Sequence, residues 1–431
     1  MRSTLLSLIV ILMLFLAGVA QAQNVEYVSC YPDSISRVFV SGDYAYVTDD
    51  SILQIIDISN PASPVPTGNY TDTTSGVIID DIFVRGDYAY VLYTHPQGPF
   101  WTFCFLDIID ISNPSNPTLM GSFGRTMYYS GDNVFVSEDC AYISRTRPEF
   151  MNPTYLDIFD VSDPDSACVV GTCNIPSFST GLFVSGGYLY EAWVFNGPTS
   201  GLCIVSVADP TYPSVMATYD SLNCAQGAYI SGSYAYIADW SSGLRILNVI
   251  DPYSPILTAS YNTSGLAQGV FVSGSNAYAA EADSGVQVIN IADPTNPVFA
   301  GGYDTQGLAS DIYVSDGYIY VADITSLMIL RFTPTGIEEN DNLPNEFSLS
   351  HNYPNPFNPS TTIQYSLPEQ SLVTIDIFDI LGRRVETLAE GIKPAGNHQA
   401  VWDASNKSSG IYFYRIKAGD KAETKKMMLI K

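Results

Sequence analysis

The sequence has 431 residues, of which 46% are hydrophobic and 13% aromatic, so the chain has enough apolar material for a large core and is not disordered. Residues 1–342 hold eight arginines, no lysine and 35 acidic residues, a formal charge of −27, whereas residues 343–431 carry +1. The acidic part would repel nucleic acid and anionic membranes. His95 is its single histidine, so we expect neither a histidine-based triad nor a multi-histidine zinc site there.

Residues 1–22 have the pattern of a secretory signal peptide. Arg2 precedes an apolar run over 5–16, and Ala20 and Ala22 form a small-x-small cleavage site. A retained membrane anchor is the alternative, which the short apolar run disfavours. We therefore predict cleavage after Ala22 and export of a mature chain without a membrane span.

Seven cysteines remain after that cleavage, and export permits disulfides. They are odd in number, lack CxxC spacing and do not recur in register, so we expect most of them to be buried small apolar residues. One or two disulfides are the alternative, with a connectivity that the sequence does not define. The cysteines are Cys30, Cys104, Cys140, Cys168, Cys173, Cys203 and Cys224.

The acidic part repeats a phrase of the type Val-Ser-Gly-x-Tyr-Ala-Tyr seven times. Successive copies start 44, 52, 48, 46, 42 and 42 residues apart. The starts are Val40, Val84, Val136, Val184, Ile230, Val272 and Val314. The third copy departs most, with Glu138 in place of the turn glycine and Cys140 in place of the first tyrosine.

Each unit predicts four strands, here named a to d. Strand a has a Gly-x-aromatic pattern (67–70, 301–303), and strand b is a short apolar run (82–84, 270–272). A Gly-Asp, Gly-Gly or Gly-Ser turn supplies positive φ before strand c, the Tyr-Ala-Tyr alternation. Strand d (53–58, 106–111, 286–291) stops at an Asn-Pro or Asp-Pro pair.

Four strands per 42–52 residues, repeated seven times, predict an all-β fold: a seven-bladed β-propeller over 24–334. Residues 25–31 match strand a, so every unit is expected to be complete. An open β-solenoid or several sandwiches are the alternatives. The propeller segment resembles the LVIVD-repeat family, named for strands such as 53–57 and 106–110. That resemblance implies the propeller fold in a secreted bacterial protein and assigns no activity.

A polar linker at 335–342 precedes a second domain at 343–431. Short alternating stretches at 362–367, 373–378, 399–402, 411–416 and 425–430 predict a small immunoglobulin-like β-sandwich. This segment resembles the type A sorting domain of the type IX secretion system, which implies export across an outer membrane and recognition by the secretion machinery. A plain sandwich or a ligand-binding module is the alternative. The resemblance lies in Asn352, Tyr353, Pro354, Asn355, Pro356, Phe357, Asn358, Pro359, Gly382, Lys425 and Lys426, among others.

No catalytic motif stands out in the sequence, and no cofactor is expected. Asp49, Asp239 and Asp323 follow strand c, and other aspartates recur on strand d, so we expect these repeated carboxylates to serve the fold. Calcium is the rival interpretation, since carboxylates suit it, but no calcium-binding repeat supports it. The Asp80-Asp81 pair is too generic to indicate a glycosidase.

The units differ in the segment between strands c and d. From the second tyrosine of c to the last position of d, it spans 11, 20, 18, 16, 12, 12 and 11 residues. The three long segments belong to adjacent units and carry aromatic and arginine residues, which indicates a contact surface. Packing of these rings on one another is the alternative. The predicted ligand-binding residues are Tyr93, Phe100, Trp101, Phe103, Arg145, Arg147, Trp193, Phe195 and Trp240.

These features predict a secreted or cell-surface binding protein that takes an extracellular glycan or protein and is not an enzyme. One alternative is an extracellular polysaccharide hydrolase or lyase that uses carboxylates in the propeller channel. A structural surface or adhesin component that self-associates is another.

Overall fold

The computed structural model describes residues 24–49, 51–72, 76–96, 102–125, 130–146, 154–195, 199–334, 347–349, 352, 355, 357–368, 371–393, 396–419 and 421–430. Every helix or strand assigned within these ranges is a β-strand. The chain divides between Thr335 and Gly336 into two compact units.

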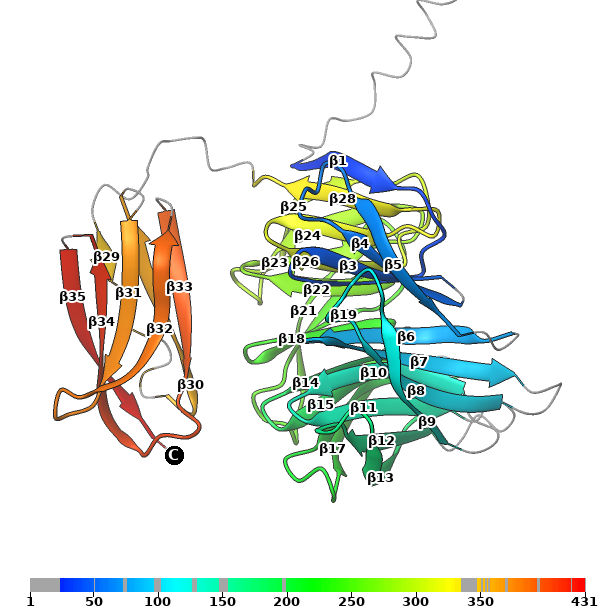
Figure 1. Cartoon of the computed structure of the whole chain (residues 1–431), viewed down its shortest axis with the longest axis horizontal. Helices are drawn as coiled ribbons and strands as arrows, with labels where there is room; N and C mark the ends of the chain where they lie inside the picture. Colours follow the sequence, from blue (N-terminus) through cyan, green and yellow to red (C-terminus); the bar gives the residue numbers. More distant parts are fainter. Residues whose placement is uncertain are drawn as a thin grey trace, which may run out of the picture. The chain divides into compact units, whose positions relative to one another are not determined.

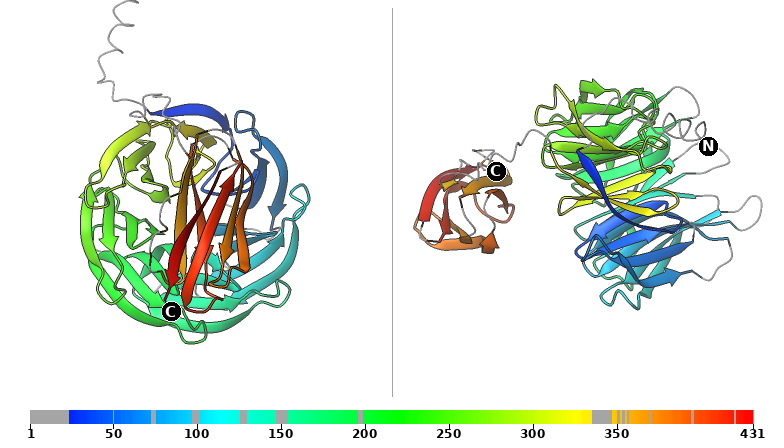
Figure 2. Two further views of the ribbon diagram at one scale, coloured as in Figure 1. Left: turned by 90° about the vertical axis from the view of Figure 1, so that its left-hand side faces the viewer. Right: turned by 90° about the horizontal axis from the view of Figure 1, so that it is seen from above.

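The strands described in the first unit form seven four-stranded antiparallel sheets, arranged as the blades of a β-propeller (Figure 1 and Figure 2). Within each blade the strands run from the centre outward. Blade one holds β2 (Arg37–Ser41), β3 (Tyr44–Thr48), β4 (Ile52–Asp57) and β5 (Val65–Thr71). Blade two holds β6 (Ile78–Arg85), β7 (Tyr88–Pro96), β8 (Thr102–Asp110) and β9 (Thr118–Arg125). Blade three holds β10 (Ser130–Ser137), β11 (Cys140–Thr146), β12 (Thr154–Asp160) and β13 (Cys168–Ile175).

The remaining blades follow the same order. Blade four holds β14 (Phe178–Ser185), β15 (Tyr188–Val194), β16 (Ser200–Ser206) and β17 (Ser214–Leu222). Blade five holds β18 (Gly227–Ser231), β19 (Tyr234–Ala238), β20 (Leu244–Asn248) and β21 (Ile256–Tyr261). Blade six holds β22 (Gly269–Ser273), β23 (Asn276–Ala280), β24 (Val286–Asn290) and β25 (Val298–Tyr303). Blade seven holds β26 (Asp311–Ser315), β27 (Tyr318–Ala322), β28 (Leu327–Phe332) and, from the other end of the chain, β1 (Val25–Tyr31).

The ring closes through β1, the outermost strand of blade seven. It pairs antiparallel with β28, from Val25 opposite Phe332 to Tyr31 opposite Leu327. A blade therefore consists of strands b, c and d of one sequence unit and strand a of the next. Each of the seven sequence units supplies all four of its strands, as expected, and the first strand a completes the last sheet.

The two-residue turns between the first two strands of each blade use left-handed backbone, as predicted. Their first residues all have φ between 50° and 61°. Glu138 and Asp316 adopt this conformation without being glycine. The seven residues are Gly42, Gly86, Glu138, Gly186, Gly232, Gly274 and Asp316.

The core lies between neighbouring blades. Leu53 and Ile55 of blade one pack in one buried cluster with Ile82 and Val91 of blade two. At the closing junction, residues of β2 such as Val38 share a cluster with residues of blade seven. Since neither blade buries these side chains alone, the closed ring is the unit that stabilises the fold.

All seven cysteines are described, and all are free thiols. Cys104 and Cys203 are buried, three others are half-buried, and Cys30 and Cys168 are exposed. The expectation that most are buried is wrong, because β1 and β13, which carry the exposed pair, are outermost strands with an edge in solvent.

The second unit is a small β-sandwich of two sheets. One sheet holds β29 (Ser348–Leu349), β30 (Ser360–Leu367) and β33 (Gly396–Asp403). The other holds β31 (Ser371–Phe378), β32 (Arg384–Lys393), β34 (Gly410–Ala418) and β35 (Lys421–Leu429). Trp402 and Tyr414, from opposite sheets, are fully buried in one shared core. The predicted sandwich is confirmed.

Candidate functional site

The second and third strands of every blade are joined on the same side of the propeller, here called the hairpin face. In blades two, three and four these strands have seven to nine residues, whereas their equivalents elsewhere have five or six. Part of the extra length that we expected to be loop is therefore strand, which extends three adjacent hairpins (Figure 1). Residues 97–101, 147–153 and 196–198, which connect these strands in the sequence, lie outside the described residues.

Two of the predicted aromatic contact residues are buried on these hairpins. Tyr93 lies on β7 and is 0% exposed, and Trp193 lies on β15 and is 6% exposed. A Cβ on Gly201, which pairs with Trp193 across the hairpin, would lie 2.9 Å from the indole ring, so the indole covers that glycine. The expectation that these two rings are exposed is wrong, because each sits on a strand inside the blade stack.

Arg145 is also an internal residue, on β11. Its Nε donates to Oδ2 of Asp157 at 2.5 Å, and its guanidinium lies 4.7 Å from the centre of the Tyr155 ring. Asp157 is fully buried and also accepts from Thr172 Oγ1 at 2.7 Å. This ion pair stabilises blade three and leaves Arg145 buried, so the expectation of an exposed polar clamp is wrong for this residue.

The other described members of the predicted set are more accessible. Phe195, at the end of β15, is 39% exposed, and Phe103 on β8 is half-buried beside Phe105, with ring centroids 6.3 Å apart. Trp240 has a φ of 46° and bonds through its backbone to Ala267 of the following connection. Phe100, Trp101 and Arg147 lie outside the described residues. Ligand binding by this set stays a prediction.

A closed ring of seven aromatic side chains, which sequence reasoning missed, surrounds the centre of the propeller. Each innermost strand contributes one ring, and every ring is 4.7–5.1 Å from the next. Neighbouring planes are turned by 48–57°, close to the rotation of about 51° between blades of a seven-bladed propeller. In order, the rings are Phe39, Phe83, Phe135, Phe183, Tyr229, Phe271 and Tyr313.

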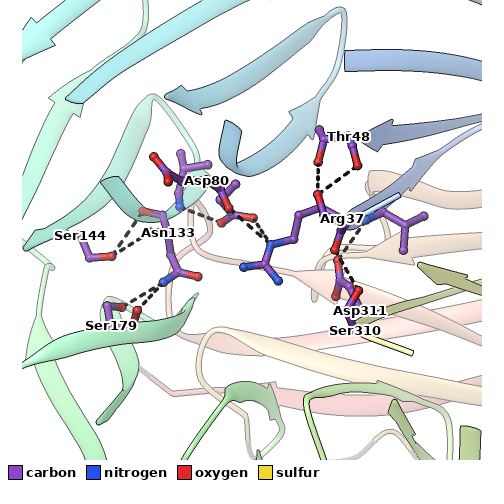
Figure 3. Close-up of polar contacts among 12 residues, drawn as sticks. Arg37, Thr48, Asp80, Asn133, Ser144, Ser179, Ser310 and Asp311 are labelled. Carbon is purple, nitrogen blue, oxygen red and sulfur yellow. Dashed lines mark hydrogen bonds and ion pairs between the residues drawn. The ribbon is translucent and has the colours of Figure 1, made fainter. Parts of the chain in front are cut away.

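A second layer, here called the polar layer, lies next to the aromatic ring on the side of the hairpin face. Its positions are two residues before each aromatic residue on the innermost strands. In blades seven, one, two and three its members are Asp311, Arg37, Asp81 and Asn133. Figure 3 labels Asp311, Arg37 and Asn133. Blades four, five and six have glycine there. A Cβ on Gly181 would lie only 3.0 Å from the Cα of Gly227, so the strands approach too closely for a larger residue.

The polar layer joins each of its blades to the next. Asp311 Oδ2 accepts the Val38 N–H at 3.0 Å, across the closing junction. Asp81 Oδ2 accepts the Val134 N–H at 2.9 Å. Asn133 Nδ2 donates to the Ser179 carbonyl at 3.0 Å, as Figure 3 shows.

Arg37 links blades one and two within this layer. Its Nε donates to the carbonyl of Asp80 at 3.4 Å (Figure 3). The same nitrogen lies 3.8 Å from Asp81 Oδ1. The layer therefore gives each of these junctions a specific hydrogen bond or ion pair.

The carboxyl groups next to this layer are protonated more readily than free aspartate. Burial raises the pKa of Asp80 to about 8, and the nearby Asp132 and Asp81 add to that shift. Burial likewise raises the pKa of Asp132 to about 7. Burial raises the pKa of Asp81 to about 6, with Arg37 acting in the opposite direction. Asp80 Oδ2 accepts from Thr94 Oγ1 at 2.6 Å, so this carboxyl also orders the start of blade two.

The repeated carboxylates hold turns, as predicted. Asp239 Oδ1 accepts the backbone N–H groups of Asn223 and Cys224 at 2.9 and 2.7 Å. On strand d, Asp57 Oδ1 accepts from the Ser59 hydroxyl at 2.6 Å and from the Ser59 N–H at 2.9 Å, and these hydrogen bonds lower the pKa of Asp57. In the described part of the chain, no group of three or more histidine, cysteine, aspartate and glutamate side chains is placed to hold a metal ion.

Residues that carry the resemblance of the tail to a sorting domain hold its first segment against the sandwich. Asn352 is buried and donates its Nδ2 to Thr361 Oγ1 at 2.9 Å, and Phe357 is buried against Trp402. Asn355 Oδ1 accepts the Met428 N–H of β35 at 3.0 Å. Asn358 precedes a cis peptide bond to Pro359.

The other tail residues singled out from the sequence divide into two groups. Gly382 has a φ of 76° in the turn after β31, and Lys425 and Lys426 lie on β35. Tyr353, Pro354 and Pro356 lie outside the described residues.

Two family models match the chain. The LVIVD-repeat model matches residues 34–72, 104–124, 130–175, 179–221, 224–263, 264–305 and 306–330. The model described as "Secretion system C-terminal sorting domain" matches residues 351–431. A search of curated proteins found no match.

Solved structures support the propeller fold alone, because their sequence identities are low. The β-propeller domain of Myceliophteria thermophila Cps50 (Swd1) aligns with a TM-score of 0.54 and 10% identity, over 71% of this chain and 99% of that chain. The WD40 β-propeller domain of Doa1 aligns with a TM-score of 0.53 and 7% identity, over 72% of this chain and 97% of that chain.

Fold and tail together define a β-propeller protein that the type IX secretion system exports across the outer membrane, to the cell surface or the medium. Among the described residues, no helix has the length and apolar character needed to span a bilayer. Since its repeat model covers more than half of the sequence, the chain belongs to the LVIVD-repeat family.

Proposed function

We propose that this chain is a secreted or surface-attached binding protein that takes an extracellular carbohydrate or protein on the hairpin face and catalyses no reaction. The observation that carries this proposal is the lengthening of the β7–β8, β11–β12 and β15–β16 hairpins on three adjacent blades. Extra length confined to one side of a repeat protein is typical of a binding surface, since the fold itself needs only the shorter hairpins found in the other blades.

The test is a glycan and peptide array probed with the mature chain, with and without calcium. Trp101→Ala and Phe195→Ala should each weaken a hit at least tenfold if the hairpin face binds the ligand. Tyr212→Ala is the matched control, because Tyr212 is 80% exposed on the β16–β17 turn, at the opposite end of β16 from the hairpin. A hit that survives both hairpin substitutions, or that Tyr212→Ala removes, would contradict the proposal.

A hydrolase or lyase is the second candidate, since Asp80 and Asp132, at equivalent positions of β6 and β10, have raised pKa values near the centre of the propeller. Their carboxyl oxygens, however, accept from Thr94 and Thr146 of their own blades. Polysaccharide cleavage by the wild type that Asp80→Asn and Asp132→Asn abolish would favour the enzyme. Concentration-dependent self-association without any array hit would instead favour a structural surface component.

We further propose that the secretion machinery recognises the tail unit directly. Removal of residues 343–431 should leave the propeller inside the outer membrane, as measured by fractionation and surface labelling. Undiminished surface export of the truncated chain would refute this.

A further inference from the structure

A pocket of about 370 Å³ lies at the junction of blades four and five. The segment that leaves β17 and the β19–β20 turn supply most of its wall, and both lie at the hairpin face. Its lining residues are Ser221, Leu222, Asn223, Asp239, Ser242, Arg245 and Leu257. This volume falls within the range of small-molecule sites, of about 300–1,000 Å³.

Arg245 is the cation of this pocket, and an ion pair with Asp239 fixes one side of its guanidinium. Its Nε lies 3.3 Å from Asp239 Oδ2, and its side chain is 22% exposed. Asp239 is itself fixed, because its other oxygen accepts the N–H groups of Asn223 and Cys224. The contact between Arg245 and Asp239 uses Nε, and within the described part of the chain no hydrogen bond engages the two terminal nitrogens of Arg245. The guanidinium is therefore positioned with its terminal donors available to a ligand in the pocket.

The arginine is specific to blade five. At the same position of strand d, blade one has Gln54, blade six has Gln287 and blade seven has Met328. Blades two, three and four carry aspartate or cysteine there. Since the other blades fold without a cation at this position, the repeat does not require Arg245 for its own architecture.

The chemistry of the pocket suits a carboxylate attached to a polyhydroxylated ring. A guanidinium with free terminal nitrogens binds a carboxylate through two parallel hydrogen bonds. The hydroxyls of Ser221 and Ser242 and the side-chain amide of Asn223 can donate to and accept from sugar hydroxyls. Leu257, which is 41% exposed, offers apolar surface to the C–H groups of a sugar ring.

We infer that this pocket binds an acidic monosaccharide unit, a uronic acid, through its carboxylate. The inference rests on the proposed function, because it names the ligand chemistry of the same face. The propeller around the pocket is strongly acidic and repels anions. The carboxylate of a ligand is therefore attracted only at Arg245, which makes this contact selective for that position. At physiological salt, ions screen charges over about 8 Å, so the more distant carboxylates of the propeller repel the ligand only weakly.

The test compares methyl β-glucuronide with methyl β-glucoside, which differ only in the carboxylate, by calorimetric titration of the mature full-length protein. The glucuronide should bind at least tenfold more tightly than the glucoside, since charge-assisted hydrogen bonds exceed neutral ones. Arg245→Gln, which places the residue of blades one and six in blade five, should abolish this difference. Arg331→Gln is the matched control, because Arg331 is exposed on β28 of another blade.

A second variant keeps the test decisive if Arg245→Gln melts at a lower temperature. Leu257→Glu adds a carboxylate at a position that is 41% exposed, and should weaken glucuronide binding at least tenfold without disturbing the fold. Equal binding of the two glycosides, no binding of either, or full binding by both variants would overturn the inference. A dialanine peptide that binds through its carboxylate better than the glucuronide would also overturn it.

Failure of the inference and failure of the proposed function are distinguishable. An array ligand that Phe195→Ala removes while Arg245→Gln retains it would leave the proposed function standing without the uronic acid pocket.

Discussion

The aromatic ring at the centre of the propeller should contribute measurably to stability, and Phe83 is the position to test it. Its ring lies 4.9 Å from Phe39 and 4.7 Å from Phe135. Truncating a buried phenylalanine to alanine costs about 3–5 kcal/mol, and each aromatic pair contributes about 0.5–1.5 kcal/mol beyond buried area. Since Phe83 is half-buried, we expect Phe83→Ala to lower the free energy of unfolding by about 3 kcal/mol.

The assay is scanning calorimetry of the mature chain, following the propeller transition. An unfolding entropy of about 2.1 cal/mol/K per residue over about 310 residues converts about 3 kcal/mol into a fall in Tm of about 5 °C. Phe83→Tyr is the matched control, because blades five and seven have Tyr229 and Tyr313 at this position, and it should melt within about 1 °C of the wild type.

A double-mutant cycle separates ring contacts from simple loss of apolar area. Alanine at both Phe83 and Phe135, which are neighbours, should show a coupling energy of about 0.5–1.5 kcal/mol. Phe83 and Phe271 are not neighbours in the ring, so their alanine substitutions should be additive. Equal melting of the alanine and tyrosine variants, or additivity in the neighbouring pair, would refute the reasoning.

Three further outcomes follow from the contacts described. Gly171→Ala should destabilise the propeller by about 1–3 kcal/mol in urea unfolding, because its Cβ would meet the carbonyl oxygen of Pro210; an unchanged midpoint would contradict this. Arg145→Met should lower the free energy of unfolding by about 3–5 kcal/mol, because it leaves Asp157 buried without its cation. Asp157→Asn in the same chain should recover part of this loss in a thermal melt, and no recovery would argue against the ion pair. The free energy of unfolding should fall between about pH 5 and 8. The cause is Asp80, whose carboxyl keeps its proton in the folded chain up to its raised pKa of about 8 but releases it near pH 4 in the unfolded chain. Tm should therefore change less with pH in Asp80→Asn than in the wild type, and identical profiles would exclude this carboxyl as the cause.

The repeated features of the fold were predictable because each depends on local chemistry. Glycine-containing turns, Asx-Pro stops and alternating strands recur in every unit, and together they predict seven sheets. The pairing of β1 with β28 was not predictable in the same way. Residues 25–31 have the pattern of every other strand a, and a local pattern does not say which sheet an outermost strand joins.

The site was predictable only in outline. The long c–d segments located the extended hairpins, but their composition suggested exposed loops. Continued pairing along β7, β11 and β15 instead turns Tyr93, Arg145 and Trp193 inward. The polar layer did leave a sequence signal, since Arg37 and Asp81 stand where other units have glycine. The sequence alone does not show that these residues share one layer, because this depends on the register of the innermost strands.

Ring closure through β1 determines when, during synthesis, the propeller can be completed. The partner of β1, β28, ends at Phe332, so nearly the whole propeller sequence must be made before the last blade is complete. Bringing the ends of about 300 residues together costs about 5 kcal/mol of chain entropy, which the paired strands offset only in the finished ring. The sorting domain lies C-terminal to that strand. A chain that ends before β28 therefore lacks both the partner of β1 and the sorting domain, so the position of the tail couples secretion to completion of the propeller.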